Sequence, residues 1–253
     1  MTAMIQSGPR VDALFSGLIL LEALADLEVA TLSQLADKAS LTSNRTFRMI
    51  GTLVESGYVI REGNKTYRLG PKILLLGHRC SKTDPLMRVA MPEIERVARE
   101  TGEAVFLGVR IGLRQVTIAS QAPLLGWVPA PRTQPQLPLH TGSMGLCLLS
   151  FAPEPVVKAV LGGPREQFTK TTLVDPNDLM HAIDGVREQG YRISTDEFTR
   201  GWTSIAAPLL DRDGLAAAAV AIGVNNRRLS KAKTKDYIAA VKRTAAAISA
   251  RML

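Results

Sequence analysis

The chain has 253 residues, of which 46% are apolar and 21% charged, and it carries a formal net charge of +8. This globular composition supplies enough apolar side chains for one large domain or two ordinary ones, and the positive charge favours a polyanionic partner without identifying it. Two cysteines, Cys80 and Cys147, exclude a disulfide scaffold, and no secretory signal or apolar run of the roughly 20 residues that cross a bilayer is visible, so we expect a cytoplasmic protein with no membrane partner.

The first 70 residues predict three short helices and a hairpin. Leucines at three- and four-residue spacing over 11–25 predict a helix with one buried face, and Thr31 or Ser33 can cap a second helix. A third helix follows Thr42 and stops at Gly57. The extended runs "YVIRE" and "KTYRLG", joined by a Gly-Asn turn, predict a hairpin. This order of elements, with short loops, is typical of a winged helix-turn-helix.

The rest of the chain predicts helices mixed with strands. Residues 71–84 predict a further helix, Pro85 interrupts it, and a domain boundary is expected near 80–85. The runs "EAVFLGVR" and "RQVTIASQ" have strand length, whereas the proline-rich segment 122–138 must be loop. "TSIAAPLLDRDGLAAAAVAIGV" predicts two strands around an Asp-Gly turn, although its alanines favour helix by intrinsic propensity. Helices are expected at "TGSMGLCLLSFA", after the next proline, at "PNDLMHAIDGVREQG" and over 230–251. The fold class is therefore α+β with one antiparallel sheet.

The third helix and the hairpin carry the residues that we predict to contact DNA. A helix fits the major groove with its N-terminal residues at base edges, where arginine can donate two hydrogen bonds to guanine, and basic hairpin residues can reach the backbone or a minor groove. Between Lys38 and Arg79 there are eight Lys or Arg residues and two Glu, a balance of +6. Thr46 also falls on the inward apolar face of the helix, with Ile50. The predicted DNA contacts are Thr42, Ser43, Asn44, Arg45, Thr46, Arg48, Arg61, Asn64, Lys65 and Arg68.

Several motifs in this order resemble the isocitrate-lyase-regulator (IclR) family of bacterial transcription factors over nearly the whole chain. They are "LTSNRTFRMIGTLVESGYVIREGNKTYRLG", "ETGEAVFLGVR", "PLHTGSMGLCLLS", "GYRISTDEFTRGWTSIAAPLLDRDG" and "AVAIGV". The resemblance implies a winged helix-turn-helix over 8–70, a linker helix over 71–84 and a GAF-like effector-binding domain over 85–253. It also implies a homodimer or homotetramer that binds palindromic operator DNA and responds to a small carboxylic or aromatic acid.

The motifs that the resemblance assigns to the effector pocket depart from the best-known family pattern. Ser194 and Ser204 stand where the family often has aspartate and cysteine, and Leu146 stands where it often has lysine. Gly223 and Asn225 replace two serines that are common on the last pocket strand. The segments "TGSMG" and "GWTSIAAP" are closer to the branch that regulates protocatechuate and β-ketoadipate catabolism. An aromatic or dicarboxylic acid effector is therefore expected.

The side chains of these motifs suit such an acid. Ser143 and the following backbone amides, near an expected helix start, can bind a carboxylate, and Ser204 and Asn225 can add hydrogen bonds. Trp202 can stack on a ring, although Trp202 and Met144 can equally belong to the core. The predicted effector-binding residues are His140, Ser143, Met144, Gly145, Leu146, Ser194, Trp202, Ser204, Gly223 and Asn225.

Two other functions use some of the same residues. His140 with Ser143 or Ser204 could pair a base with a nucleophile, but "TGSMG" is not the G-x-S-x-G elbow of a hydrolase, so we expect no enzyme. The three histidines are scattered along the chain, so no metal is expected, and no cofactor motif is visible. A small-molecule sensor that acts through protein partners, with a degenerate winged helix, is the remaining alternative, and the basic third helix argues against it.

Overall fold

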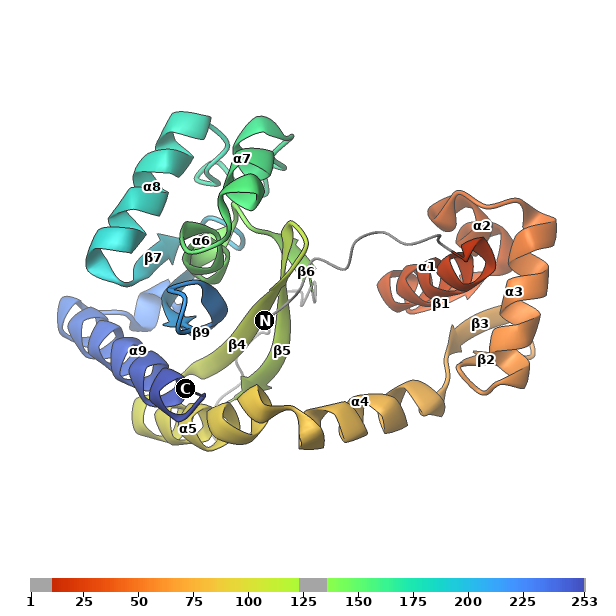
Figure 1. The fold of residues 1–253 in the computed structure, drawn as a ribbon, viewed down its shortest axis with the longest axis horizontal. Coiled ribbons are helices and arrows are strands. Elements are labelled where there is room, and N and C mark those ends of the chain that lie inside the picture. The colour runs from red at the N-terminus through yellow and green to blue at the C-terminus, as the bar shows by residue number, and fades with distance from the viewer. Residues whose placement is uncertain (1–10, 123–135, 253) are drawn as a thin grey trace. The chain divides into compact units, whose positions relative to one another are not determined.

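The computed structural model describes residues 11–122 and 136–252, and the chain divides into two compact units between Thr83 and Asp84. The first unit contains a small sheet among short helices (Figure 1). Its elements are α1 (Asp12–Leu27), β1 (Val29–Thr31), α2 (Leu32–Ala39), α3 (Ser43–Glu55), β2 (Val59–Arg61), β3 (Thr66–Leu69) and α4 (Pro71–Thr83).

The small sheet has the order β1-β3-β2, and both of its strand pairs are antiparallel. The β2–β3 hairpin is confirmed, whereas β1 is absent from the predicted elements because three residues carry too little periodicity. α2 begins with a capping box. Thr31 accepts a hydrogen bond from the backbone of Gln34, and the Gln34 side chain accepts one from the backbone N–H of Thr31 at 2.8 Å. Thr31, rather than Ser33, is therefore the cap.

The core of the first unit is formed where α1, α2 and α3 meet the sheet. Leu20, Leu24, Leu35 and Ile50 are fully buried there, and Val59 closes the sheet side. Because α3 uses one face for this core, its opposite face is exposed to solvent.

α4 differs from the other helices of this unit because none of its residues is buried. Leu74 is 76% exposed, and Leu75 and Leu76 are nearly half exposed. At its amino end Lys72 donates from Nζ to the carbonyl of Ser56 at 3.0 Å. Except for the partly buried Ile73, the apolar side chains that predict this helix are therefore exposed in their own unit.

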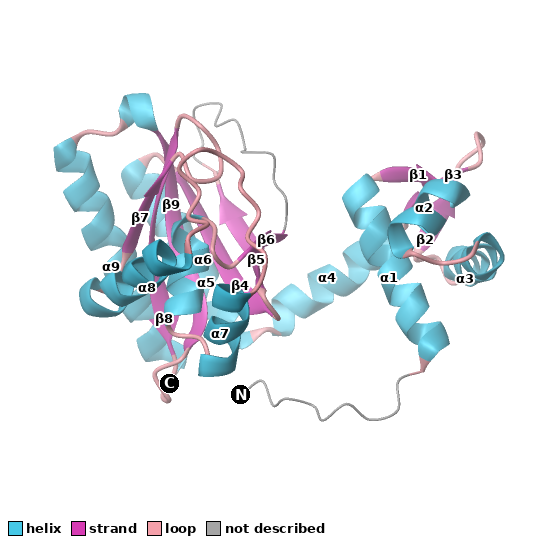
Figure 2. Ribbon diagram, turned by 90° about the horizontal axis from the view of Figure 1, so that it is seen from above, coloured by secondary structure: helices cyan, strands magenta, loops and turns pink. Residues whose placement is uncertain are grey.

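The second unit is built on a six-stranded antiparallel sheet of order β6-β5-β4-β9-β8-β7. Helices lie on both faces of this sheet (Figures 1 and 2). Its elements are α5 (Pro85–Thr101), β4 (Ala104–Ile111), β5 (Arg114–Gln121), β6 (Gln136–Pro138), α6 (Gly142–Ser150), α7 (Glu154–Gly162), α8 (Pro176–Gln189), β7 (Arg192–Thr195), β8 (Trp202–Leu210), β9 (Ala216–Asn225), η1 (Asn226–Arg228) and α9 (Lys231–Met252).

Each face of the large sheet has its own core. α5 and α9 cover the face that carries Val220 and Ile222, whereas α6 and α8 cover the face that carries Ala219 and Ala221. Burial on both faces explains why the alanine run forms strand β9 rather than the helix that its propensity favours. The expected α+β class with one antiparallel sheet in this unit is confirmed.

Two strands of this sheet differ from the sequence analysis. Residues 136–138 form β6, which pairs with β5, so the segment 122–138 is not all loop; residues 123–135 lie outside the described part. The edge strand β7 is missing from the predicted elements because "RIST" is short and does not alternate, yet its four residues all pair with β8. In the described residues, no helix is both long and apolar enough to span a membrane.

Candidate functional site

The amino-terminal turns of α3 present polar side chains to solvent. Thr42 caps the helix, because its Oγ1 accepts a hydrogen bond from the backbone N–H of Arg45 at 3.4 Å. Ser43, Asn44 and Arg48 are exposed. Four of the predicted DNA contacts therefore lie together at the start of one exposed helix, with Arg48 one turn after Asn44.

Two other predicted DNA contacts on α3 are placed differently. Thr46 is fully buried, so it cannot contact DNA in this conformation, and its predicted place on the inward face is the correct one. Arg45 is exposed, but its Nη2 donates to the carbonyl oxygen of Asp12 at 2.9 Å. Its guanidinium is thus held against the start of α1.

The β2–β3 turn carries the remaining predicted DNA contacts. Lys65 has a φ of 62°. The Asn64 side chain accepts hydrogen bonds from the backbone N–H and the hydroxyl group of Thr66, so the Asn64 amide closes the turn. Arg68 Nε lies 2.8 Å from Glu62 Oε1, and this ion pair offsets the charge of both residues. Arg61 and Lys65 are exposed and supply the remaining positive charge of the hairpin.

In the second unit, the start of α6 meets the large sheet at a pair of serines. The Oγ atoms of Ser143 and Ser204 lie 2.6 Å apart and share a hydrogen bond. Ser204 is paired in register with Ser194 on β7 and with Gly223 on β9. Since directly opposed residues point to the same face of a sheet, four predicted effector residues gather on the α6 side.

Trp202 and Asn225 lie opposite each other in the next row of this surface. Trp202 is half-buried, and Asn225 accepts a hydrogen bond from the backbone N–H of Arg227 at 3.0 Å. Phe106 on β4 is paired with Ala221 of β9, and a carbon of its ring lies 3.0 Å from the position that a Cβ on Gly223 would take. The sequence gives no sign of this role for Phe106, because the pairing of β4 with β9 cannot be read from β4 alone.

On α6, the three residues that follow Ser143 hold the helix against the rest of the unit. A Cβ on Gly145 would lie 2.7 Å from the carbonyl oxygen of Leu139, so only glycine allows this approach. The Met144 side chain lies over Gly108 in the same way, and Leu146 is fully buried. These contacts support a positioning role, in which they fix Ser143 opposite the sheet.

His140 is only 2% exposed and lies just before α6. Its Nε2 is 3.0 Å from the carbonyl oxygen of Glu166, which can only accept, so Nε2 carries the proton and donates. Burial, helped by the positive charge of Arg165, lowers the pKa of this imidazole below its usual value, against the opposing effect of the Glu166 hydrogen bond. His140 is therefore neutral at pH 7.

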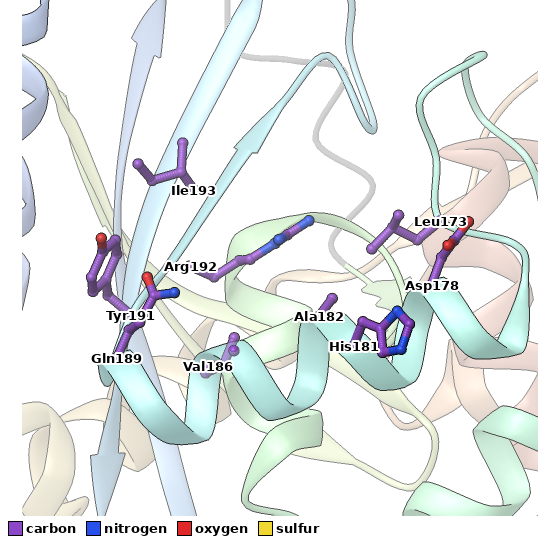
Figure 3. A pocket seen from close by; sticks show the side chains of 10 residues that line it. Leu173, Asp178, His181, Ala182, Val186, Gln189, Tyr191, Arg192 and Ile193 are labelled. Carbon is purple, nitrogen blue, oxygen red and sulfur yellow. The ribbon is translucent and has the colours of Figure 1, made fainter.

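A pocket of about 500 Å³ lies between α8 and the edge strand β7 (Figure 3). Arg192 extends into it and donates from Nη2 to Glu197 Oε1 at 2.8 Å. None of the ten predicted effector residues lines this pocket, and "HAIDGVREQGYRI" gives no sign of it beyond an amphipathic helix. Its lining is Leu173, Asp178, His181, Ala182, Gly185, Val186, Gln189, Tyr191, Arg192 and Ile193. Among the described residues, no cluster of three or more His, Cys, Asp or Glu could hold a metal ion.

The chain matches two family models in succession. Residues 13–63 match the IclR helix-turn-helix domain, and residues 78–250 match the model described as bacterial transcriptional regulator IclR C-terminal. The HTH-type transcriptional regulator KdgR of Escherichia coli is 28% identical over 92% of this chain and 89% of its own length. The Pca regulon regulatory protein of Pseudomonas putida is 28% identical over 81% of this chain and 71% of its own length. These relatives are transcriptional regulators and not enzymes, as the sequence analysis predicts.

Solved structures show the same fold. An IclR transcriptional regulator from Alicyclobacillus acidocaldarius superposes with a TM-score of 0.89 at 23% identity, over 96% of this chain and 99% of that one. An IclR homolog from Microbacterium hydrocarbonoxydans, complexed with 4-hydroxybenzoate, superposes with a TM-score of 0.77 at 23% identity, over 94% and 98%. In each case a single chain has the same fold over nearly its whole length.

Because the native state keeps His140 neutral, this residue makes the fold sensitive to acid. Below about pH 6.5, His140 binds a proton in the unfolded chain but resists protonation in the folded chain. The free energy of unfolding therefore falls as the pH falls through that range. We expect the substitution His140→Asn to reduce the loss of unfolding free energy between pH 7.5 and pH 5.5, measured by urea denaturation. The matched control is His181→Asn at the exposed His181, and an equal pH dependence in all three proteins would contradict the assignment.

Proposed function

The chain belongs to the IclR family of bacterial transcriptional regulators, and on that premise we propose that it binds palindromic operator DNA as a dimer and that a small carboxylic or aromatic acid changes this binding. Such a regulator works in the cytoplasm. The observation that carries the proposal is the exposed, basic start of α3 beside the basic β2–β3 hairpin. The protein uses no cofactor in this scheme.

The DNA contacts of this proposal follow from the two exposed basic elements. The start of α3 enters the major groove, where Asn44 suits adenine and Arg48 suits guanine. The hairpin follows the adjacent backbone or minor groove through Arg61 and Lys65. Arg45 contributes only its charge to the local potential, since its guanidinium is bound to a carbonyl oxygen, and the charge of Arg68 is offset by the Glu62 carboxylate.

Exposed apolar side chains of the first unit support the proposed dimer. On α1, Val11, Leu14 and Leu18 are 50% to 65% exposed at three- and four-residue spacing, and on α4 Leu74 is 76% exposed. A stripe of this kind needs a covering surface, and a second copy of the chain offers the same stripe. The two-fold symmetry of such a pair matches a palindrome with half-sites about 34 Å apart. Pairs of dimers would give the tetramer that the family resemblance also allows.

The effector site of this proposal is the cluster around the buried Ser143 and the half-buried Ser204. Their hydroxyl groups can bond a carboxylate, and Phe106 and Trp202 can pack against a ring. A solved relative binds 4-hydroxybenzoate, and another relative regulates the Pca regulon, which supports an aromatic acid here as well. The acid acts only if its affinity differs between the DNA-bound and free states.

We expect Arg48→Ala to weaken operator binding by about 1–3 kcal/mol and to relax the base preference at one position. Lys65→Ala should weaken binding to every sequence and lower the slope of log affinity against log salt by about 1. Duplexes selected from a random library by the protein serve as probes, and fluorescence anisotropy gives the affinities. Lys158→Ala, in the second unit, is the control, and selection of no sequence at all by the unaltered protein would exclude the proposed function.

The double variant Leu18→Asp with Leu74→Asp places charges on the exposed stripe of each helix. It should convert the dimer to a monomer in sedimentation velocity, since burying an unpaired carboxylate in the interface is costly. Leu215→Asp, at an exposed leucine of the β8–β9 turn, should leave the dimer intact. An unchanged sedimentation coefficient in the double variant would place the interface elsewhere.

Calorimetry with 4-hydroxybenzoate separates the two candidate effector sites. Ser204→Ala removes one hydroxyl group and should weaken binding about tenfold, equivalent to ~1.4 kcal/mol for a hydrogen bond to a charged group. Gly185→Leu fills the α8–β7 pocket, where a Cβ on the glycine would meet Gln189 Nε2 at a non-clashing 3.9 Å, and should leave the affinity unchanged. The opposite pattern would move the effector to that pocket, and absence of binding in all proteins would exclude this acid.

A further inference from the structure

The exposed face of α3 contains one large apolar side chain among its polar ones. Phe47 is 60% exposed, although it stands in the middle of a helix whose inward face is well packed. At 3.6 residues per turn it lies on the same side of the helix as Asn44 and Gly51, which are three residues before and four after it, whereas Arg48, the next residue, points about 100° away on the adjoining part of the exposed face. All four residues are exposed.

Packing within the unit does not account for this phenylalanine. A single exposed apolar residue needs no explanation by itself. Phe47, however, is a neighbour on the helix surface of Asn44 and Arg48, the two side chains that the proposed function assigns to base edges. Thr46 and Ile50 already fill the inward face, so the ring of Phe47 points away from the core.

The space around the ring is also open on one side. Gly51 lies one turn further along the helix, and a Cβ built on it would meet nothing within 4 Å. A glycine in the middle of a helix costs about 1 kcal/mol relative to alanine. Here the missing side chain leaves the flank of Phe47 free, so a flat surface can approach the ring and the helix backbone together.

We propose that Phe47 contacts the C5-methyl group of a thymine in the major groove and makes the protein select thymine at one position of each half-site. This inference rests on the proposed binding of operator DNA. The thymine methyl is the apolar group that the major groove presents at base edges, and a phenylalanine side chain is an apolar partner for it. Asn44 lies on the same side of the helix as the ring and Arg48 on the adjoining part of the exposed face, so their bases neighbour or pair with the position that Phe47 reads.

The position of Phe47 favours this role over two others. An apolar wedge that unstacks bases enters from the minor groove, whereas Phe47 belongs to the helix and not to the hairpin. A protein partner on the same face would have to bury the charge of Arg48 beside the ring, which is costly without a carboxylate opposite it. A duplex meets both requirements, since it offers a methyl group to the ring and acceptors to the guanidinium.

The test replaces thymine by deoxyuridine, which removes the methyl group and nothing else. Duplexes are first selected from a random library by the full chain, and each thymine of the selected sequence is then changed in both half-sites. For the unaltered protein, one position should lose about fourfold in affinity per half-site, as burial of one methyl group predicts. Phe47→Ala should bind the two duplexes equally at that position.

Arg48→Ala is the matched control, because it changes a neighbouring residue on the same face. It should bind all duplexes more weakly and keep the preference for thymine over deoxyuridine. Phe47→Leu, which keeps an apolar side chain, should retain part of the preference.

Each contrary result has a separate meaning. If the unaltered protein binds thymine and deoxyuridine duplexes equally at every position, the assignment of Phe47 is wrong while the proposed function stands. If Phe47→Ala binds more weakly but keeps the same preference, Phe47 acts on the fold and the assignment is again wrong. If no sequence is selected from the library, the proposed function itself fails.

Discussion

Burial of one face of α3 is the constraint on which the first unit depends. Ile50 and Thr46 are fully buried, and Met49, Leu53 and Val54 pack against the same core, so the helix cannot rotate without exposing this face. Adjacent side chains in a helix point about 100° apart. With Thr42 fixing the first turn, a shift of the sequence by one position would carry Asn44 and Arg48 off the exposed face. The core therefore sets which side chains can meet a partner, before any partner is present.

The second unit uses the same logic on a sheet that is covered on both faces. Small alanines on β9, Ala219 and Ala221, face α6, whereas the larger Val220 and Ile222 face α5 and α9. A close approach on the alanine side brings the start of α6 within hydrogen-bonding distance of β8, where the row of alanines gives way to Ser204. The alanine run that forms strand β9 thus also positions the Ser143–Ser204 pair at the edge of the core.

Most elements of both units can be predicted from the sequence because each has a local signal. Leucine spacing predicts α1, the Gly-Asn turn predicts the β2–β3 hairpin, and the Asp-Gly turn predicts β8 and β9 despite their alanines. The strands β1, β6 and β7 have only three or four residues, and β1 and β6 depend on partners at least 20 positions away in sequence, whereas β7 pairs with the next strand but is too short to show a periodicity. The same limit applies to side chains. The exposure of Arg48 can be predicted from helical periodicity. Only the tertiary structure shows the hydrogen bond of Arg45 to α1, the approach of Phe106 to Gly223 and the α8–β7 pocket.

The hydrogen bond from Arg45 to the carbonyl oxygen of Asp12 joins the first turn of α3 to the beginning of α1, the helix with the exposed leucines. This hydrogen bond links the two helix ends, so they move together. A surface that packs against the outer side of α1 therefore bears on the helix end to which the first turn of α3 is bonded. Substitutions on the outer side of α1 can then alter the exposed start of α3 without a change among the residues that would touch the bases.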